Sequence, residues 1–338
     1  WIVLGFHDPD IELLNRTVPS PDSESVLMMA QLLASTQSKC FIADVKQAFT
    51  QGLKHQRKVP LYARPPPGGF PGCPDENLVA RLDTEVYGLI TGPPNWRRTL
   101  KSSLKKLNFT QHQLESCLYI YFEQKVATGW ILVVMDDLFG GGTSSNFWKA
   151  TEELRKEYQF GKWKDPQVEE TDYAGRTVRQ RADFGFEFSM AKYVSEKVRE
   201  IRIEKGRAAK EDMEANDGEI KGMRAVCGSL LWAAREGRPD IAGEVNILSG
   251  TLPKPKIGDL KKANQTVRHL HATPNVIIQV RPIPLDRIVG ITITDASLNN
   301  AKDGKSQLAY LIGFADKAVL DGHPAEMSVL GWKSKASP

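Results

Sequence analysis

The sequence predicts an α+β fold, in which a few extended runs that form antiparallel strands alternate with helical stretches. Two apolar runs, "CLYIYFE" and "GWILVVM", are separated by only a short polar link, which is typical of neighbouring antiparallel strands. A third apolar run, Phe41 to Ala43, leads directly into Asp44 and also indicates a strand. Helical patterns before, between and after these runs complete the mixed class.

The expected elements of the first half follow one another in a clear order. Residues Val26 to Ser35 form an apolar helical stretch after "PSPDSES", where proline and serine indicate a turn and a helix start. The segment from Arg64 to Asn77 is expected to be a loop, because proline fixes φ and glycine interrupts regular structure. A basic amphipathic helix is expected from about Asn95 to Leu107, and a charged helix over "NFWKATEELRKEYQF".

The second half is mainly helical by pattern. Residues Asp165 to Glu187 are polar and irregular, Met190 to Ile203 are expected to be helical, and "GRAAKEDMEANDGE" is expected to be a solvated linker. Two helices joined by a turn are expected over "MRAVCGSLLWAAREGRPDIAGEVNILSG", and a basic helix over "DLKKANQTVRHLHA". A boundary is placed near Pro274 to Leu285, after which "IVGITITDAS" begins a new strand.

Composition indicates an ordinary globular protein of two or three structural units. The 338 residues are 41% hydrophobic and 25% charged, and the net charge of +4 is too small to indicate nucleic-acid binding by itself. The four cysteines lie far apart without a C-x-x-C pair, which argues against a zinc ribbon or a disulfide framework and fits a reducing compartment.

The ends of the sequence and its apolar runs bear on location. No apolar run approaches the roughly 18 residues that a membrane span needs, and the N-terminus lacks the plan of a signal peptide. We therefore expect no membrane association. The chain begins with "WIVLGFHDPD", without an initiator methionine, and ends at "WKSKASP", so we expect it to be a piece of something longer.

Two adjacent aspartates, Asp136 and Asp137, follow the apolar run in "WILVVMDDLFGGG". Like charges held close together raise each other's pKa unless a divalent cation compensates, and Mg²⁺ is commonly held by one or two carboxylates with substrate phosphates. The alternative is a solvated hairpin turn. If the strand ending in Asp44 joins the same sheet, three carboxylates would suit two metal ions for phosphoryl or nucleotidyl transfer. For Asp44 the alternative is a strand-end or N-cap residue.

The order of several sequence blocks resembles the reverse transcriptase of copia-type LTR retrotransposons. "DVKQAF" and "LYARPPPGGFPG" are similar to its first catalytic block and the Pro-Pro-Gly-Phe stretch that follows. "VYGLITGPPNW" resembles Leu-Tyr-Gly-Leu-Lys-Gln-Ala-Pro-Arg-Ala-Trp, and "SCLYI" follows at the expected place. "VMDDL" lies where the family has Tyr-Val-Asp-Asp followed by an apolar residue. "GSLLWAAREGRPDIAGEVNILS" is similar to the family's Gly-Ser-Leu to Thr-Arg-Pro-Asp-Ile-Ala segment. "VGITITDASLNNAKDGKS" resembles the start of its ribonuclease H domain.

The resemblance implies roles for particular residues. The catalytic and metal-binding carboxylates, for Mg²⁺ or Mn²⁺, would be Asp44, Asp136 and Asp137. Phe49 would be the aromatic gate that excludes a 2′-hydroxyl, and Asp295 would be the first metal carboxylate of the ribonuclease H domain. The remaining nucleotide-binding residues would place backbone N–H groups near the triphosphate (Val45, Lys46) and shape the pocket for base and template (Tyr87, Gly88).

Three departures from the family pattern bear on activity. Val134 and Met135 replace the family's Tyr-Val, and a methionine in that slot occurs in retroviral polymerases. Ile90 and Thr91 replace Lys-Gln, which removes a polar contact expected near the incoming nucleotide. The sequence ends before the other acidic residues of a ribonuclease H site, so we expect no hydrolysis of hybrid strands by this chain.

Basic helices and several single residues have two interpretations each. Arg97, Arg98, Lys101 and Lys105 share a helix face by spacing and either track nucleic-acid phosphates or form a solvated face. For the other candidates a structural role is favoured: surface or capping positions for His269 and His271, packing positions for Trp96 and Trp232, and a flexible hairpin exit for Phe139 to Asn146.

The sequence therefore predicts a polymerase right-hand fold with a truncated ribonuclease H-like domain. We expect fingers and palm over 1–165, a helical thumb and connection region over 166–280, and the ribonuclease H-like part over 281–338. The expected function is RNA-directed DNA polymerase, with a primed RNA or DNA template and deoxynucleoside triphosphates as partners, inside the cell in a cytoplasmic particle or the nucleus. The alternatives are a decayed or repurposed element product that binds nucleic acid without catalysis, favoured by Ile90, Thr91 and Val134, and a metal-dependent nuclease.

Overall fold

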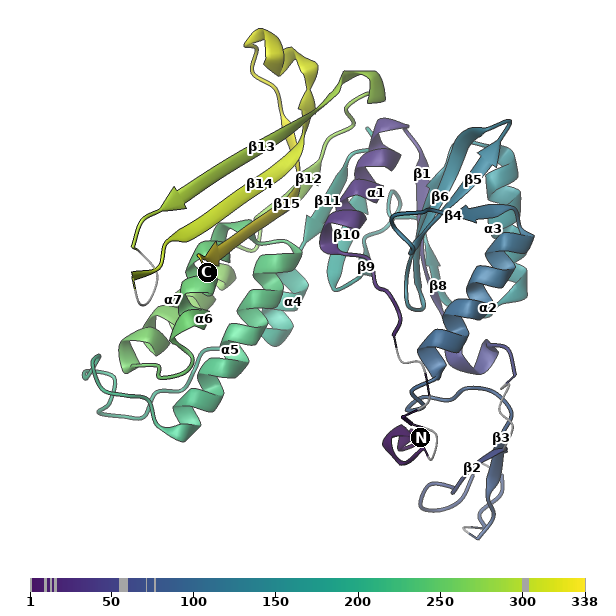
Figure 1. Ribbon diagram of the computed structural model, residues 1–338, viewed down its shortest axis with the longest axis horizontal. Coiled ribbons are helices and arrows are strands. Elements are labelled where there is room, and N and C mark those ends of the chain that lie inside the picture. Colours follow the sequence, from purple (N-terminus) through teal and green to yellow (C-terminus); the bar gives the residue numbers. More distant parts are fainter. Residues whose placement is uncertain are drawn as a thin grey trace. The chain divides into compact units, whose positions relative to one another are not determined.

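The computed structural model describes residues 2–8, 11–12, 14, 17–54, 60–70, 72–75, 77–299 and 304–337. The chain divides into two compact units, which are described separately (Figure 1). The first unit comprises Trp1–Pro21 and Phe41–Lys164, and the second comprises Asp22–Cys40 and Asp165–Pro338. Within the described part, no helix is both long and apolar enough to cross a membrane.

A six-stranded sheet with the order β4-β5-β6-β7-β1-β8 forms the centre of the first unit. The hairpin expected over "CLYIYFE" and "GWILVVM" is present as antiparallel β5 and β6. The strands are β1 (Lys39–Val45), β4 (Phe109–Gln111), β5 (Leu118–Glu123), β6 (Val126–Val134), β7 (Asp137–Gly142) and β8 (Phe160–Lys164). A small antiparallel pair and two short 3₁₀ helices complete the unit: β2 (Leu61–Ala63), β3 (Ala80–Leu82), η1 (Gly5–His7) and η2 (Ala48–Gln51).

Two helices, α2 (Gly92–Lys106) and α3 (Ser145–Glu157), pack on this sheet. Both are amphipathic helices that the sequence predicts. Trp96 and Leu104 of α2 and Phe147 of α3 are buried in one cluster with side chains of β1, β6 and β7. Because these apolar side chains are removed from water, their burial stabilises the unit and fixes both helices on the sheet.

The described part of the second unit combines five α-helices with two antiparallel sheets. Helices α5, α6 and α7 lie side by side, and α4 packs against α5 and α7. The helices are α1 (Ser23–Ser35), α4 (Ala191–Lys197), α5 (Asp217–Glu236), α6 (Ala242–Thr251) and α7 (Ile257–Ala272), with 3₁₀ helices η3 (Pro239–Ile241), η4 (Leu285–Arg287) and η6 (Lys317–Asp321). One sheet has the order β12-β11-β10-β9: β9 (Thr171–Tyr173), β10 (Arg176–Gln180), β11 (Phe186–Ser189) and β12 (Ile277–Val280).

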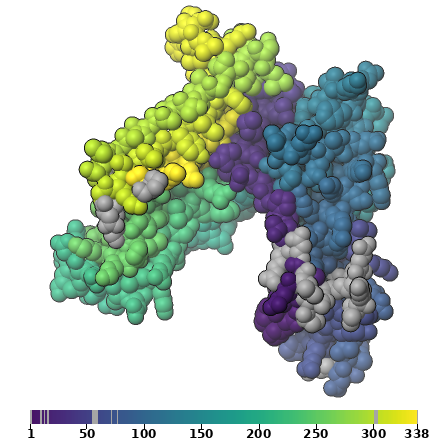
Figure 2. Space-filling model, viewed as in Figure 1, coloured from purple at the N-terminus to yellow at the C-terminus, as the bar shows by residue number. Residues whose placement is uncertain are grey.

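The second sheet of this unit has three long strands, β13 (Ile288–Ser297), β14 (Gln307–Asp316) and β15 (Met327–Ala336). The sequence predicts β13 at this place. Most side chains of β13 are exposed, and its yellow-green atoms lie at the surface in Figure 2. Strand β15 contacts α1, α6 and β12, so it helps to join this sheet to the rest of the unit.

The polar interval from Asp165 to Glu187 is not irregular, as the sequence suggested, because it contains β9, β10 and the start of β11. These strands are three to five residues long, and buried and more exposed positions alternate along them. So short an alternation is difficult to distinguish from a polar loop in sequence. The buried side chains include a charged one, Arg176, which hides the strand pattern further.

The helix expected from Met190 to Ile203 ends early, at Lys197. The chain then runs extended because Ile201 is fixed by a residue of α7. Asn264 accepts a hydrogen bond from the Ile201 N–H at 2.7 Å and donates one to its carbonyl at 2.9 Å. Tertiary hydrogen bonding therefore overrides the local helical preference here.

Two buried arginines connect the secondary-structure elements of the second unit. Arg176 of β10 bonds to Ser23 of α1 and pairs with the Glu236 carboxylate of α5 at 2.6 Å. Arg238 pairs with Asp240 at 2.7 Å and donates to Thr273 after α7. The Arg-Pro-Asp segment that the sequence singled out thus has a structural role in this unit.

We expect Arg176→Met to lower the free energy of unfolding by about 3–5 kcal/mol, because it leaves the buried Glu236 charge without its partner. Urea denaturation followed by circular dichroism measures the change. The exposed Arg179→Met on the same strand is the matched control and should shift stability by less than about 0.5 kcal/mol. Equal midpoints for the two variants would contradict the prediction.

Candidate active site

A two-residue turn carries the adjacent aspartates. Strands β6 and β7 are antiparallel, and the pairing of Val134 with Asp137 leaves Met135 and Asp136 as the turn. The φ of Met135 is +57°, which lies in the left-handed region of the backbone. Tight hairpin turns require this region, and residues other than glycine adopt it at a cost in conformational energy. The turn therefore needs support from the surrounding structure.

That support comes from Trp96 of α2. Its indole N–H donates a hydrogen bond to the Met135 carbonyl at 3.0 Å, and the ring is 1% exposed. A buried indole N–H needs an acceptor, so this bond satisfies the tryptophan and holds the turn at once. The sequence identified Trp96 only as a packing residue. The role of its N–H was missed, because the acceptor is a backbone atom far away in sequence.

The first aspartate, Asp44, lies on the neighbouring strand of the same sheet. Strands β1 and β7 are adjacent, and the Val45 N–H donates to the Asp136 carbonyl at 3.0 Å. The structure thus brings the strand that ends near Asp44 beside the turn that carries Asp136 and Asp137. All three side chains are only partly exposed.

The electrostatics of these carboxylates reflect their proximity. Burial raises the pKa of Asp137 to about 6, and the charges of Asp136 and Asp44 contribute to the rise. Burial also raises the pKa of Asp136, and Asp44 adds to this shift. Like charges held in a partly buried place are costly, which is a common property of sites that bind a cation.

A lysine on the next strand compensates part of this charge. Lys162 of β8 stands opposite Asp44 in the β1–β8 register, and its Nζ lies 3.5 Å from the Asp137 carboxylate. Lys162 counteracts the rise in the Asp137 pKa. Next to it, a Cβ on Gly161 would lie 2.7 Å from the Asp44 carboxylate, so this position leaves no room for a larger residue unless Asp44 moves. Neither residue was singled out from the sequence.

The carboxylates match the ligand chemistry of Mg²⁺, which prefers carboxylate oxygens. Among the residues that the structure describes, however, no three His, Cys, Asp or Glu side chains are gathered closely enough to hold a metal ion. The Asp137 carboxylate is directed to Lys162 instead. Binding of a metal by all three aspartates would therefore require Asp137 to exchange this partner, and the predicted metal site stays a prediction.

Two aromatic residues expected at the nucleotide pocket lie together. The ring centroids of Phe49 and Tyr87 are 4.9 Å apart, and the Phe49 ring packs closely over Gly92 at the start of α2. Burial raises the pKa of the Tyr87 phenol, and Asp136 and Asp44 raise it further, which places Tyr87 within electrostatic reach of the carboxylates. The ring pair and the carboxylates thus belong to one region of the first unit.

Gly88 has a backbone reason to be glycine. Its φ is +101°, and a Cβ there would lie 1.8 Å from the carbonyl oxygen of Val3. The N–H of Val3 donates to the Tyr87 carbonyl at 2.9 Å, which holds the two segments at this close approach. Gly88 therefore permits the packing that positions Tyr87.

The backbone donors expected for a triphosphate are already used within the protein. The Val45 N–H bonds to Asp136, and the Lys46 N–H donates to the Gln159 carbonyl at 2.9 Å. These bonds join β1 to β7 and to the start of β8, so they serve the sheet. The prediction from sequence overlooked them, because they depend on strand order. The side chain of Lys46 is exposed.

Three of the four cations predicted for the basic face of α2 are exposed. Arg98, Lys101 and Lys105 are exposed, as expected for a surface that contacts phosphates. Arg97 is different, because its guanidinium donates to the carbonyls of Ser116 at 2.8 Å and Pro19 at 3.2 Å. These bonds use part of its guanidinium within the protein, and the nucleic-acid contact expected of Arg97 stays a prediction.

One of the departures from the family pattern, Thr91, has a bonding partner within the protein. Thr91, where the family has glutamine, donates a hydrogen bond from its hydroxyl to the Glu85 carboxylate at 2.7 Å, just before α2.

The glycines after the Asp-Asp turn do not form a flexible exit but belong to buried β7. A Cβ on Gly140 would meet the Phe41 ring at 2.5 Å, and one on Gly142 the Phe147 ring at 2.7 Å, so glycine admits these aromatic rings against the sheet.

Three further predictions fall in the second unit. Asp295 is exposed on β13, and its carboxylate accepts the N–H of Ala296 at 2.8 Å. His269 and His271 bond to Asp240 and the Val198 carbonyl, which agrees with structural roles. Trp232 is not a core residue, because it is 42% exposed on α5 and lies over Gly175.

Comparisons with known proteins bear on the identity of the chain. The chain is 27% identical over 252 residues to a transposon Ty5-1 protein of Saccharomyces cerevisiae, a match that covers 70% of this chain and 78% of that protein. It is 22% identical to the retrovirus-related Pol polyprotein from transposon TNT 1-94 of Nicotiana tabacum, with 87% of this chain and 23% of the polyprotein covered. For the polyprotein from transposon RE1 of Arabidopsis thaliana, the identity is 24%, with 69% and 16% covered.

The chain thus spans about a quarter or less of the two polyproteins. A family model matches the chain over residues 2–214, which is more than half of its length. This match and the transposon relatives confirm the resemblance predicted from the sequence blocks. The chain belongs to the reverse transcriptase (RNA-dependent DNA polymerase) family.

Proposed function

We propose that this chain is the polymerase part of a copia-type retrotransposon Pol protein. It would add deoxynucleotides to the 3′ end of a primer on an RNA or DNA template. The observation that carries the proposal is the bond between Val45 and Asp136, which joins the strand of Asp44 to the turn of Asp136 and Asp137. Family membership supports a nucleotidyl transferase of this kind, and it generally implies divalent metal, template and nucleotide.

The three aspartates would hold Mg²⁺ or Mn²⁺, which would supply activation of the primer hydroxyl and neutralise charge on the phosphates. The chain's own residues have separate tasks. Trp96 holds the turn in place, and Lys162 balances the Asp137 carboxylate while no cation is bound. Phe49 and Tyr87 form an aromatic wall that would lie against the sugar and base of the incoming nucleotide.

We further propose that the chain has the right-hand polymerase organisation that the sequence predicts. The sheet with α2 and α3 would provide the palm within fingers and palm over 1–165. The helices of 166–280 would form a thumb and connection region. The three strands of 281–338 would begin a ribonuclease H-like domain. The exposed cations of α2 would contact the phosphates of the template and primer.

The first test is primer extension with Mg²⁺ by the wild type and Asp136→Asn. We expect the substitution to reduce incorporation by at least about 100-fold, because a neutral amide cannot compensate a divalent cation as a carboxylate does. Binding of primer–template should change little. Equal incorporation by both proteins would show that the site is misassigned, and no incorporation by the wild type would favour a non-catalytic nucleic-acid-binding product.

The second test addresses the support of the turn. Trp96→Phe keeps an aromatic ring but leaves the Met135 carbonyl without its donor, so we expect kcat to fall about tenfold or more with a nearly unchanged KM for the nucleotide. The matched control is Trp148→Phe, which removes an indole bond of 3.2 Å to the Gly142 carbonyl at the far end of β7. If both variants lose activity equally, the turn has no special need for Trp96.

The third test concerns the basic face of α2. In a triple variant with alanine at Arg98, Lys101 and Lys105, affinity for a primer–template duplex should depend less on salt. The slope of log K against log salt concentration should decrease by about 2.7, at about 0.9 for each phosphate that the variant no longer neutralises. A control with alanine at the exposed Lys205, Lys210 and Lys254 of the second unit carries the same charge change. Equal slopes for the two variants would exclude α2 from the interface.

A further inference from the structure

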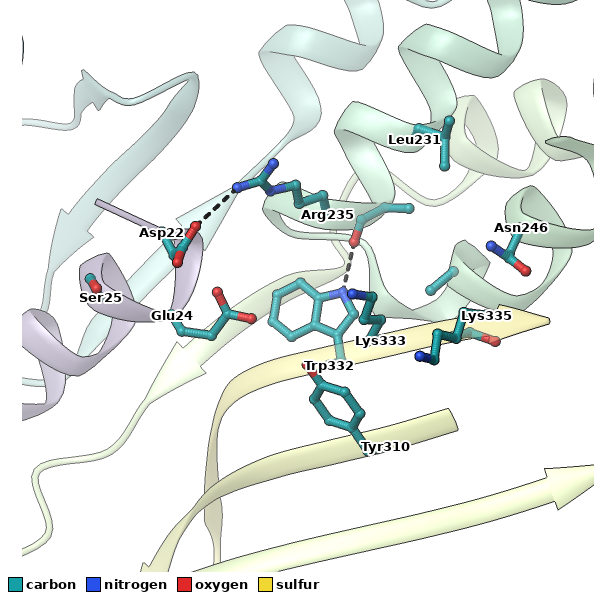
Figure 3. Close-up of a pocket in the computed structure, with 13 residues that line it drawn as sticks. Asp22, Glu24, Ser25, Leu231, Arg235, Asn246, Tyr310, Trp332, Lys333 and Lys335 are labelled. Carbon is teal, nitrogen blue, oxygen red and sulfur yellow. Dashed lines mark hydrogen bonds and ion pairs between the residues drawn. The ribbon is translucent and has the colours of Figure 1, made fainter. Parts of the chain in front are cut away.

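The last strand of the second unit, β15, lines an open pocket of about 690 Å³ (Figure 3). The other walls come from β14, the start of α1, and the helices α5 and α6. The volume falls within the roughly 300–1,000 Å³ of typical ligand pockets. Because the strand order is β13-β14-β15, β15 is an edge strand of its sheet. The pocket therefore lies at a sheet edge, where an extended peptide can add a strand.

Two hydrogen bonds show which backbone groups of β15 point away from β14. The Ser337 N–H donates to the carbonyl of Ser306, which immediately precedes β14, at 2.7 Å. The Ala336 N–H instead donates to the side-chain oxygen of an asparagine in α6 at 3.1 Å. Successive residues of an antiparallel strand direct their N–H and C=O groups to alternate sides. The backbone groups of Ser334 and Trp332 therefore point outward, as the N–H of Ala336 does.

These outward groups leave part of the sheet edge open. Among the described residues, none forms a hydrogen bond with the backbone N–H or C=O groups of Trp332 and Ser334 on this side. The open part is short, because α6 bonds to Ala336 at one end and the Arg281 N–H donates to the Ser328 hydroxyl near the other. An open edge pairs readily with an extended chain, since every pairing residue supplies a donor and an acceptor.

The side chains of β15 lie on two different faces beside this open edge. Trp332 lies on one face, where its indole N–H donates to the Ala234 carbonyl of α5 at 2.7 Å, as the dashed line in Figure 3 shows. Lys333 and Lys335 are exposed on the opposite face, because successive side chains of a strand alternate. An added strand would therefore meet α5 on one side and two cations on the other.

The face of Trp332 offers apolar contacts. Leu231 lies one helical turn before Ala234 on α5, and it is 42% exposed although its side chain is large and apolar. Both residues line the pocket together with Ala242 at the start of α6. Apolar side chains of an added strand would be removed from water on this face, which favours binding.

The opposite face selects the charge of the partner. Lys333 and Lys335 are about 6.6 Å apart along the strand, which is also the spacing of alternate residues in a paired strand. Acidic residues at alternate positions would therefore lie opposite both lysines. A second copy of β15 centred on Ser334 would instead place Lys333 opposite Lys335, and like charges opposite each other are destabilising. Lysines on an edge thus disfavour self-association and favour an acidic partner.

Acidic side chains limit this preference to one end of the pocket. Asp22 and Glu24 also line the pocket, and in Figure 3 they lie on the side of Trp332 away from Lys335. Arg235 lies 3.5 Å from Asp22 and offsets part of its charge. Negative charge on a partner is therefore favoured beside the lysines, and a basic residue is favoured at the other end.

We propose that the β15 edge binds an extended acidic peptide of a partner protein as an additional antiparallel strand. The peptide residues opposite Trp332 and Ser334 exchange backbone hydrogen bonds with them and direct apolar side chains toward α5. The acidic residues between them face Lys333 and Lys335. The antiparallel direction is the more stable one per residue. This surface contains none of the residues of the proposed polymerase site, so the two proposals are tested separately.

The backbone pairing is tested with the whole chain and the peptide Glu-Val-Glu-Val-Lys, which carries fluorescein at its N-terminus and an amide at its C-terminus. Fluorescence anisotropy measures its affinity and that of two N-methylated forms. Methyl groups on the valine nitrogens remove the donors that face β15, and we expect affinity to fall at least about tenfold. Methyl groups on the glutamate nitrogens point away and should change it less than about twofold. Equal losses, or the reverse order, would overturn the proposal.

The charge preference is tested by a double variant with Lys333→Glu and Lys335→Glu. We expect it to bind Glu-Val-Glu-Val-Lys at least about tenfold more weakly than the wild type, and to bind Lys-Val-Lys-Val-Lys more tightly than the wild type does. The matched control carries the same charge change at the exposed Lys205 and Lys210. Circular dichroism shows whether each variant is folded. Equal affinity of the two folded variants for the acidic peptide would overturn the proposal.

The location of the added strand is tested by amide hydrogen exchange, followed residue by residue with NMR. When the acidic peptide saturates the chain, the outward N–H groups of Trp332 and Ser334 gain acceptors and should exchange at least about tenfold more slowly. The N–H of Lys333 points toward β14 and should change much less. Unchanged exchange at Trp332 and Ser334 would overturn the proposal.

Discussion

The candidate site depends on one backbone hydrogen bond between neighbouring strands. The Val45 N–H donates to the Asp136 carbonyl, so β1 and β7 are in register at the point where both carry acidic side chains. A strand shifted by one residue would turn Asp44 to the opposite face of the sheet. The core packing of α2 and α3 on the sheet, and the indole bond of Trp96 to the turn, all act to preserve this register. The chemistry thus rests on the rigid part of the first unit, and not on a loop.

The same register creates an electrostatic cost that the structure has to balance. Burial raises the pKa of Asp136 and of Asp137, and the charges of the neighbouring carboxylates raise both further. Lys162 offsets part of this cost, since it stands opposite Asp44 and next to Asp137. A divalent cation would offset more of it, because it carries twice the charge. The arrangement is consistent with a site in which cation binding replaces the Lys162 contact, and in which the free protein remains folded.

Much of the first unit could be predicted from sequence, because the signals there are local. The hairpin of β5 and β6, the amphipathic α2 and the apolar strand before Asp44 follow from apolar periodicity. The contributions of Trp96, Lys162 and Gly161 could not be predicted, because each depends on which strand or turn lies opposite. For the same reason the amides of Val45 and Lys46 were assigned to a ligand although the sheet uses them. Local pattern named the candidate residues, whereas strand order determines which contacts several of them make.

The second unit shows how a motif of a family can be structural. The Arg-Pro-Asp segment places Arg238 in a fully buried position, where Asp240 and Thr273 satisfy its guanidinium and join the end of α5 to the end of α7. Arg176 does the same for α1, β10 and α5 through Ser23 and Glu236. A buried charge without its partner is strongly destabilising, so such a pair constrains both residues at once. The two buried arginines therefore serve the folding of this unit, because each one joins elements that lie far apart in the sequence.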